Sequence, residues 1–244
     1  MNIKYDLHMH THYSDGKSTM EENVKAAIAK GLDMIAITDH GPEHYFFGIK
    51  EADIIKLREQ VNAMNEKYPE IEVLLGIEAN ILGVDGTIDA TDMIKENIDV
   101  LLAGYHFGSK PVRFWRDIKI HIYNLLGKKI PYFRKKIKNF NTLSLVNAMR
   151  KYDIDILTHP GDKGDVDMDK VARVAAETGT KLEINERHTH LTVDEIKIAM
   201  THDVEFIVSS DAHLAEHIGV YDDVMARIES AGLDKNRIVN YRGD

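Results

Sequence analysis

Residues Met34–His40 read MIAITDH, a short apolar run that leads directly into an acid and a histidine. Four consecutive apolar residues next to polar ones are typical of a buried β-strand. Helical patterns flank this run, at Met20–Lys30 before it and from about Glu51 to Lys67 after it. Because strand and helix alternate, this part of the chain predicts a parallel strand whose neighbours are reached through helices.

The same alternation continues outward to both ends of the chain. Further strands are predicted at Ile3–Leu7, Ile71–Leu75, Asp99–Ala103, Ile154–Leu157, Lys181–Ile184 and Phe206–Val208. Helical patterns separate the later strands, at Leu143–Lys151, Met168–Glu177, Val193–Met200 and Val220–Ser230. Seven units with no linker and no break in composition favour an α/β barrel over a doubly wound sheet.

Composition excludes several classes of protein. The chain has 244 residues, of which 43% are hydrophobic, 29% are charged and none is cysteine. A disulfide scaffold, a cysteine-ligated metal site and a thiol nucleophile are therefore excluded. The N-terminal MNIKYDLHMH has no apolar signal core, and no apolar stretch approaches the roughly 20 residues of a membrane span. We expect a globular, cytoplasmic protein with no membrane partner.

The charge is distributed unevenly along the chain. The net charge is −9, yet residues 106–138 carry ten Lys and Arg against one acid. Aromatic residues are interleaved with these cations, so we treat about 107–139 as a basic insertion. Three interpretations stay open: a lid over a phosphorylated substrate, on which Arg113 and Arg116 would bind it, a nucleic-acid contact, or a solvated face. The acidic remainder of the chain argues against a broad nucleic-acid surface.

Side chains that can bind metals gather at the ends of the predicted strands. Nine of them follow six strands: His8, His10, Asp15, His40, Glu78, His106, His159, Asp211 and His213. In a parallel barrel the C-terminal strand ends meet at one face, so these residues would converge. His8 and His10 stand two residues apart and project the same way from a strand, as two ligands of one ion must.

Each of these residues also has an ordinary structural explanation. A single histidine at a strand end is more often a hydrogen-bonded loop residue, and Asp or Glu in that position often caps the next helix. Their concentration at strand ends favours a metal site over these explanations. Imidazole and carboxylate together suit zinc, manganese or iron.

Six segments resemble the PHP (polymerase and histidinol phosphatase) family, in the right order along nearly the whole chain. They are DLHMHTHYSDG (Asp6–Gly16), AITDHG (Ala36–Gly41), LLGIEANI (Leu74–Ile81), AGYH (Ala103–His106), LTHPG (Leu157–Gly161) and SSDAH (Ser209–His213). The resemblance is to the short stand-alone bacterial phosphatases of this family. It implies one PHP domain over residues 1–244, folded as a distorted seven-stranded TIM-like barrel.

The resemblance also implies a centre of three divalent ions, with zinc, manganese or iron as the candidates. The first ion would be held by His8, His10, Glu78 and Asp211, the second by Glu78, His106 and His159, and the third by Asp15, His40 and His213. Glu78 would then bridge two ions. Asp15 matches the aspartate of the common SDG form of the motif, whereas some stand-alone members have histidine at that position.

A centre of this kind predicts hydrolysis of phosphate monoesters. Three divalent ions and three carboxylates leave a local charge of about +3, which suits an anionic substrate. A hydroxide bridging two ions would attack phosphorus in line, so no protein nucleophile is required. Glu78 and His10 would take part in catalysis as metal ligands. Arg187 and His188, after the sixth strand, are candidates to bind the phosphate.

The expected partner is thus a small phosphorylated substrate, and the oligomeric state stays open. Three alternatives remain at this point. A narrower one is histidinol-phosphate phosphatase, which the family name suggests and no residue establishes. The others are an exonuclease on single-stranded nucleic acid, with nucleic acid the less favoured partner, and a metal-binding domain without catalysis. The presence of all nine candidate ligands argues against the last.

Overall fold

The computed structural model describes residues 3–111 and 131–243, with only the backbone given for 131–134. Seven strands form one parallel sheet in the order of the chain. They are β1 (Tyr5–Asp6), β2 (Met34–Ile37), β3 (Glu72–Asn80), β4 (Val100–Gly104), β5 (Ile156–Leu157), β6 (Lys181–Asn185) and β7 (Phe206–Ser209). The predicted single-domain, distorted seven-stranded α/β barrel is confirmed.

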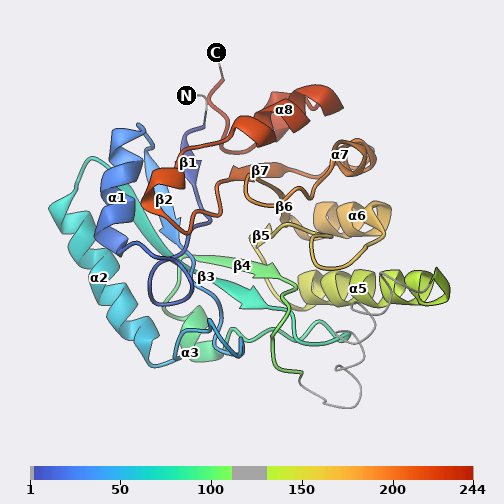
Figure 1. Ribbon diagram of the computed structural model, residues 1–244, viewed down its shortest axis with the longest axis horizontal. Coiled ribbons are helices and arrows are strands. Elements are labelled where there is room, and N and C mark those ends of the chain that lie inside the picture. Colours follow the sequence, from blue (N-terminus) through green and yellow to red (C-terminus); the bar gives the residue numbers. More distant parts are fainter. Residues whose placement is uncertain (1–2, 112–130, 244) are drawn as a thin grey trace.

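Helices cover the outside of the sheet (Figure 1). They are α1 (Met20–Ala29), α2 (Asp53–Lys67), α3 (Asp92–Lys95), α5 (Pro131–Lys151), α6 (Met168–Thr178), α7 (Val193–Ala199) and α8 (Asp222–Ala231). Capping boxes begin two of them: Thr19 and Glu22 at α1, and Thr192 and Glu195 at α7. Among the described residues, no helix combines the length and the apolar character that crossing a membrane requires.

Two apolar layers result from the alternation of side chains along the strands. Outward-facing residues such as Ile35, Ile37 and Val208 join the large core beneath the helices. Inward-facing residues form a smaller cluster of Ala36, Val100, Leu102, Ile156 and Ile207. This inner cluster fills one end of the barrel, so the polar side chains farther along the same strands lie on an apolar floor.

Two predicted boundaries were wrong, and one of them concerns a site residue. The third strand does not end at Leu75 but continues to Asn80, so Glu78 lies within β3 rather than after it. Residues 72–75 pair with β2, whereas 76–80 pair with β4, and this change of partner extends the strand. A Cβ at Gly76 would come within 2.6 Å of Val100, so glycine is needed where the partners change.

The second boundary lies in the predicted basic insertion. Helix α5 begins at Pro131, twelve residues before the predicted start at Leu143, so residues 131–139 belong to a helix. The preceding residues 112–130, with Arg113 and Arg116, lie outside the described part of the chain. The predicted roles of that segment and of its two arginines stay predictions.

The C-terminal segment closes the barrel between β1 and β7, which share no ladder in the described chain. The backbone N–H of Lys4 donates to the Asn240 carbonyl (2.8 Å), and that of Val239 donates to the Phe206 carbonyl (2.9 Å). The buried amide of Asn240 donates to the carbonyls of Tyr5 and Val208, both at 2.7 Å. One side chain therefore joins the two edge strands.

Replacing Asn240 by alanine is expected to destabilise the barrel. The change leaves buried carbonyls of both edge strands without a partner, at about 1–3 kcal/mol for each lost contact. The expected loss is about 2–4 kcal/mol in the free energy of unfolding, measured by urea titration. Asn236→Ala is the control, because the Asn236 side chain is exposed and should change stability by less than about 0.5 kcal/mol. Equal, small losses in both variants would contradict the closing role of Asn240.

Candidate metal centre

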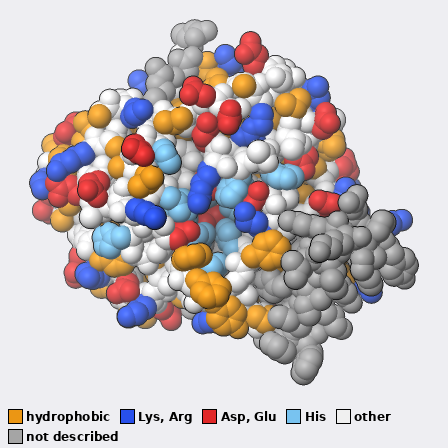
Figure 2. All heavy atoms as spheres, in the orientation of Figure 1, with side chains coloured by type: hydrophobic (Ala, Val, Ile, Leu, Met, Phe, Trp, Pro, Cys, Tyr) orange, Lys and Arg blue, Asp and Glu red, His pale blue; other side chains and the backbone are white. Residues whose placement is uncertain are grey.

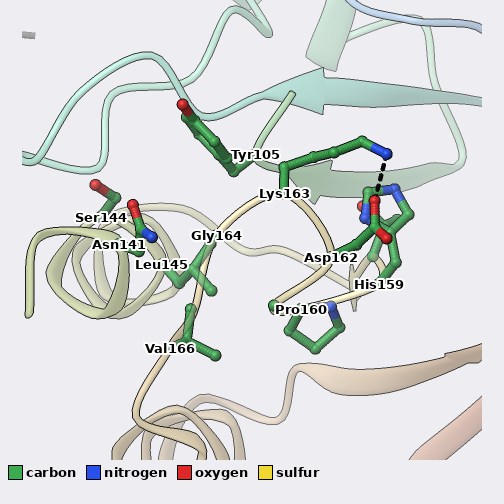
Figure 3. Close-up of a pocket in the computed structure, with 12 residues that line it drawn as sticks. Tyr105, Asn141, Ser144, Leu145, His159, Pro160, Asp162, Lys163, Gly164 and Val166 are labelled. Carbon is green, nitrogen blue, oxygen red and sulfur yellow. Dashed lines mark ion pairs between the residues drawn. The ribbon is translucent and has the colours of Figure 1, made fainter. Parts of the chain in front are cut away.

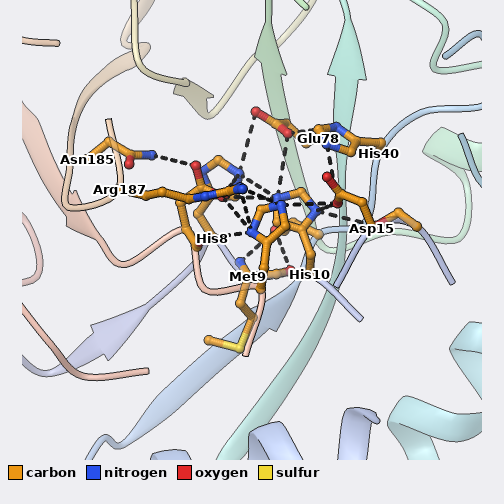
Figure 4. A network of polar contacts seen from close by, with 12 residues as sticks. His8, Met9, His10, Asp15, His40, Glu78, Asn185 and Arg187 are labelled. Carbon is orange, nitrogen blue, oxygen red and sulfur yellow. Dashed lines mark hydrogen bonds and ion pairs between the residues drawn. The ribbon is translucent and has the colours of Figure 1, made fainter. Parts of the chain in front are cut away.

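The nine predicted metal ligands meet at the C-terminal face of the barrel. His8 and His10 follow β1, His40 follows β2, Glu78 projects from β3, and His106 follows β4. His159, Asp211 and His213 follow β5 and β7, while Asp15 comes from the loop after β1. Figure 4 shows His8, His10, Asp15, His40 and Glu78 pointing toward one another from these different strands. Convergence at this face follows from the parallel strands, whose C-terminal ends share one side.

Their ligand atoms form four overlapping groups, and within each group the atoms lie within 4.8 Å of one another. The groups are His10, Asp15, His40 and His213; His8, His10 and Asp211; His40, Glu78 and His106; and His159, His188 and Asp211. All nine predicted ligands are included, and His188, predicted to bind substrate, joins them. The division of these residues among three ions stays a prediction.

Glu78 lies at the centre of the arrangement. Its Oε1 is 3.0 Å from His159 Nε2, 3.1 Å from His106 Nε2 and 3.5 Å from His8 Nε2. Its Oε2 is 2.9 Å from His40 Nδ1 and 3.7 Å from His10 Nε2. One buried carboxylate therefore faces five imidazoles, as a residue that bridges ions would.

Several buried polar atoms here form no hydrogen bond within the described chain, although each lies within 4 Å of an oppositely charged group. They include Asp15 Oδ1, His40 Nδ1, Glu78 Oε2 and Asp211 Oδ1. In addition, His8 Nε2 and His10 Nε2 approach to 3.2 Å. Buried polar atoms without partners are costly, and a cation among them would satisfy nitrogen and oxygen together. The donor set of imidazole and carboxylate thus fits zinc, manganese or iron.

The electrostatics of the cluster favour positive charge at its centre. Burial by itself would raise the pKa of Glu78, but the surrounding His106, His8 and His40 hold that pKa well below its usual range. Burial lowers the pKa of His106 to about 4. Burial also opposes charge on His40, yet Glu78 and Asp15 raise its pKa to about 10. The ionised carboxylates attract a cation, and metal ions satisfy that demand without protonated imidazoles.

A second layer of side chains orients the imidazoles. Glu183 Oε1 lies 2.6 Å from His8 Nδ1, and Glu183 Oε2 accepts from the backbone N–H of His159 (2.8 Å). On the other side, Asn80 Oδ1 lies 2.9 Å from His106 Nδ1. The buried Asp89 holds that amide by accepting from Asn80 Nδ2 at 2.7 Å. Such contacts fix the ring orientation and leave the opposite nitrogen free for a metal.

Sequence reasoning missed Glu183, Asn80 and Asp89. A signal for Glu183 was present, because Glu183 and Asn185 stand two residues apart on β6 and project to one face, like His8 and His10. Glu183 also adds a buried carboxylate beside His8, which lowers the predicted local charge from about +3 to about +2. That charge still suits an anionic substrate.

Backbone strain coincides with two of the predicted ligands. In the described chain, the non-glycine residues with positive φ are His159 (27°) and Asp211 (51°). Both follow short strands at the mouth of the barrel. Conformations of this kind cost about 1–3 kcal/mol and persist where the surrounding structure imposes them, often at functional sites. Here they direct two side chains inward.

The cluster forms the floor of a cavity of about 180 Å³. Arg187, predicted to bind phosphate, lines it with its Nη1 3.8 Å from Asp211 Oδ1. His188 bridges two carboxylates, 3.3 Å from Asp211 Oδ2 and 3.2 Å from Asp162 Oδ2. Lys163, which the sequence did not single out, also lines the cavity. Figure 2 shows histidines gathered in a hollow with cationic side chains beside them.

Lys163 also borders a second, much smaller cavity between α5 and the loop after β5 (Figure 3). In that loop Lys163 pairs with Asp162, the carboxylate that also contacts His188. The remaining lining includes Tyr105, Leu145 and Val166 and is mostly apolar. Through Asp162, this loop therefore connects Lys163, which lines the main cavity, to His188.

Comparison with known proteins places the chain among phosphatases of one family. The profile of the PHP domain matches residues 6–187. A protein of Thermoanaerobacter sp. (strain X514) named "Probable phosphatase" is 27% identical over 260 residues, covering 98% of this chain and 91% of its own. A protein of the same designation from Shewanella sp. (strain W3-18-1) is 28% identical over 250 residues, covering 98% and 88%.

Among solved structures, the histidinol phosphate phosphatase of Lactococcus lactis, crystallised with zinc, L-histidinol and phosphate, resembles this chain with a TM-score of 0.64. The alignment covers 95% of this chain and 94% of the Lactococcus chain at 15% sequence identity, so the two proteins share a fold. The profile match spans most of the barrel and includes seven of the nine converging side chains. The chain therefore belongs to the PHP domain family.

Proposed function

We propose that the protein is a metal-dependent phosphatase that hydrolyses small phosphate monoesters. The observation that carries the proposal is the convergence of nine histidines and carboxylates around one cavity, with Glu78 facing five of the imidazoles and several buried ligand atoms making no hydrogen bond in the described chain. Membership of the PHP family and relatives named as probable phosphatases support it. A cavity floored by metal-binding groups and bordered by Arg187 and Lys163 suits a small anion.

The nine side chains would hold three divalent ions. Glu78 would contribute to two of them, with His8, His10 and Asp211 around the first and His106 and His159 around the second. His40 lies close to both Glu78 (2.9 Å) and Asp15 (3.6 Å), so it would stand between the second and third ions. Divalent ions at such sites supply Lewis acidity and activate water for attack on phosphorus.

The chain's own residues do the positioning. Glu183 and Asn80 hold the rings of His8 and His106, and Arg187 offers a planar guanidinium that suits two phosphate oxygens. The narrower hypothesis of histidinol-phosphate phosphatase stays a prediction, since the likeness to that enzyme extends to the fold alone. The exonuclease hypothesis also stays a prediction.

Two parallel assays test the proposal. Release of inorganic phosphate from a generic aryl phosphate is measured beside release of nucleotides from single-stranded DNA, with the protein as purified. Phosphate release that depends on divalent metal is the expected result. Nucleotide release without phosphate release would replace the phosphatase by the exonuclease. Absence of both, with metal bound, would favour a metal-binding domain without catalysis.

Removing metal is expected to lower the melting temperature. Ions that bind the native state alone stabilise it by about 4 kcal/mol when their concentration is 1,000 times Kd. For a chain of this size that corresponds to a fall in Tm of roughly 10 °C after chelation. Calorimetry on protein verified as metal-free by elemental analysis makes the measurement. Return of the lost stability with Mn²⁺ or Zn²⁺ is the control, and an unchanged Tm would count against the metal centre.

Glu78→Gln is expected to impair activity more than Asp15→Asn. Glu78 faces five imidazoles, whereas Asp15 is closest to His213 (3.1 Å) and is partly exposed. We expect about a 1,000-fold loss of kcat/KM for Glu78→Gln and about 10- to 100-fold for Asp15→Asn. Bound metal is counted in each variant, and Glu78→Gln should lose more. Glu72→Gln, exposed on the same strand, is the matched control. Similar mild losses at both positions would rule out Glu78 as the bridge.

A further inference from the structure

Exposed aromatic rings gather at the mouth of the cavity that the predicted metal ligands line. Eight large hydrophobic side chains are exposed in the described part of the chain, and four of them form one group: Tyr45, Phe46, Phe47 and Phe107. The other four, Ile55, Met93, Leu143 and Ile198, belong to separate helices. Figure 2 shows hydrophobic side chains directly beside the histidines of the hollow. Scattered apolar residues need no explanation, whereas a contiguous group often marks a binding site.

Hydrogen bonds fix this aromatic group in place without any ligand. His44 Nε2 donates to the Phe107 carbonyl (2.9 Å), so His44 Nδ1 can accept from the backbone N–H of Phe47 (3.2 Å). Two further backbone bonds tie the segments 43–45 and 108–110 together, from Tyr45 N to Gly108 O (2.9 Å) and from Lys110 N to Glu43 O (2.7 Å). The rings are therefore carried on two segments that support each other.

A series of stacked rings connects this group to the metal ligands. The ring of His44 stacks on that of His40, with centroids 5.4 Å apart and planes 17° from parallel. The ring of Phe47 in turn stacks on the ring of His44, with centroids 5.1 Å apart and planes 24° from parallel. Phe47 and Phe107 line the same cavity as Glu78 and Arg187. One cavity thus combines a floor that suits an anion with an aromatic wall, and the ring of His44 lies between the wall residue Phe47 and the predicted ligand His40.

We propose that this site selects phosphate monoesters whose leaving alcohol carries an aromatic ring close to the ester oxygen. The inference rests on the phosphatase function proposed above. With the phosphoryl group at the cavity floor, the ring of the alcohol would stack against Phe47 and Phe107. Water adds its oxygen to phosphorus, the bond from phosphorus to the ester oxygen breaks, and the alcohol leaves with a proton, so inorganic phosphate and the alcohol are the products.

Aromaticity, rather than apolar character alone, is the feature that such a wall recognises. Offset-stacked or edge-to-face ring pairs contribute beyond the area they bury. A saturated ring of equal size buries similar area yet has no flat π face. Phe47, 43% exposed, has an accessible surface for such a partner while its backbone is held by His44. The prediction is a preference for aromatic over saturated rings of the same size.

Benzyl phosphate and cyclohexylmethyl phosphate form the matched substrate pair, because their leaving alcohols differ only in ring saturation and have similar acidity. The metal-loaded enzyme is expected to favour benzyl phosphate about tenfold in kcat/KM, the size of one to two ring contacts. Phe47→Leu should remove most of this preference by raising KM for benzyl phosphate, with cyclohexylmethyl phosphate changed less than about twofold. Phe47→Tyr should restore the preference, and Ile198→Ala, on the distant helix α7, is the control.

Binding of the corresponding phosphonates, which are not hydrolysed, gives an independent measurement. Benzylphosphonate should raise the Tm of the wild-type protein more than cyclohexylmethylphosphonate, and Phe47→Leu should abolish the difference. Equal kcat/KM for the two esters in the wild type, or an equal loss for both in Phe47→Leu, would overturn the aromatic selection. If neither ester releases phosphate, the phosphatase proposal fails, and the difference between the phosphonates then decides on the aromatic wall alone.

Discussion

A carboxylate that is cut off from water must be surrounded by positive charge, and the upper half of this barrel is built around that requirement. Glu78 is 1% exposed and faces five imidazoles from four other strand ends. Asp211, equally buried, lies among His8, His10 and His188. Isolated buried carboxylates are expensive, so such a cluster persists only with cations or protonated rings within it. Divalent metal ions would supply this positive charge, and they are also the ions that activate water for attack on phosphate esters.

The barrel supplies the geometry that this cluster needs. The inner apolar layer around Leu102 and Ile156 closes one end of the barrel. The inward-facing polar residues farther along the same strands therefore face one another at the other end. Asn240 and the C-terminal segment join β1 to β7, which fixes His8 and His10 relative to Asp211. Left-handed backbone at His159 and Asp211 coincides with two predicted metal ligands, where such strain orients the side chains toward the cluster.

In the proposed phosphatase, two parts of this cavity would recognise the substrate: the charged floor and the aromatic wall. The metal-binding floor and Arg187 would attract any phosphate monoester with comparable strength, because they contact the common phosphoryl group. Discrimination among esters has to come from the surface that meets the leaving group, and here that surface is aromatic. The ring of His44 contacts both the predicted ligand His40 and the wall residue Phe47, so the position of His44 bears on both parts of the cavity.

The amino-acid sequence by itself determined the seven strands, the barrel and the nine residues that converge on its face. Hydrophobic periodicity and the placement of polar residues after strands are local features, and parallel strands convert them into one site. Tertiary structure alone decided that Glu78 lies within a strand, because β3 changes its pairing partner at Gly76. It also decided the contacts of Glu183, Asn80 and Asp89, the closure by Asn240 and the position of Phe47 beside the cavity. Each of these depends on hydrogen bonds or packing between residues far apart in the chain, which no local pattern encodes.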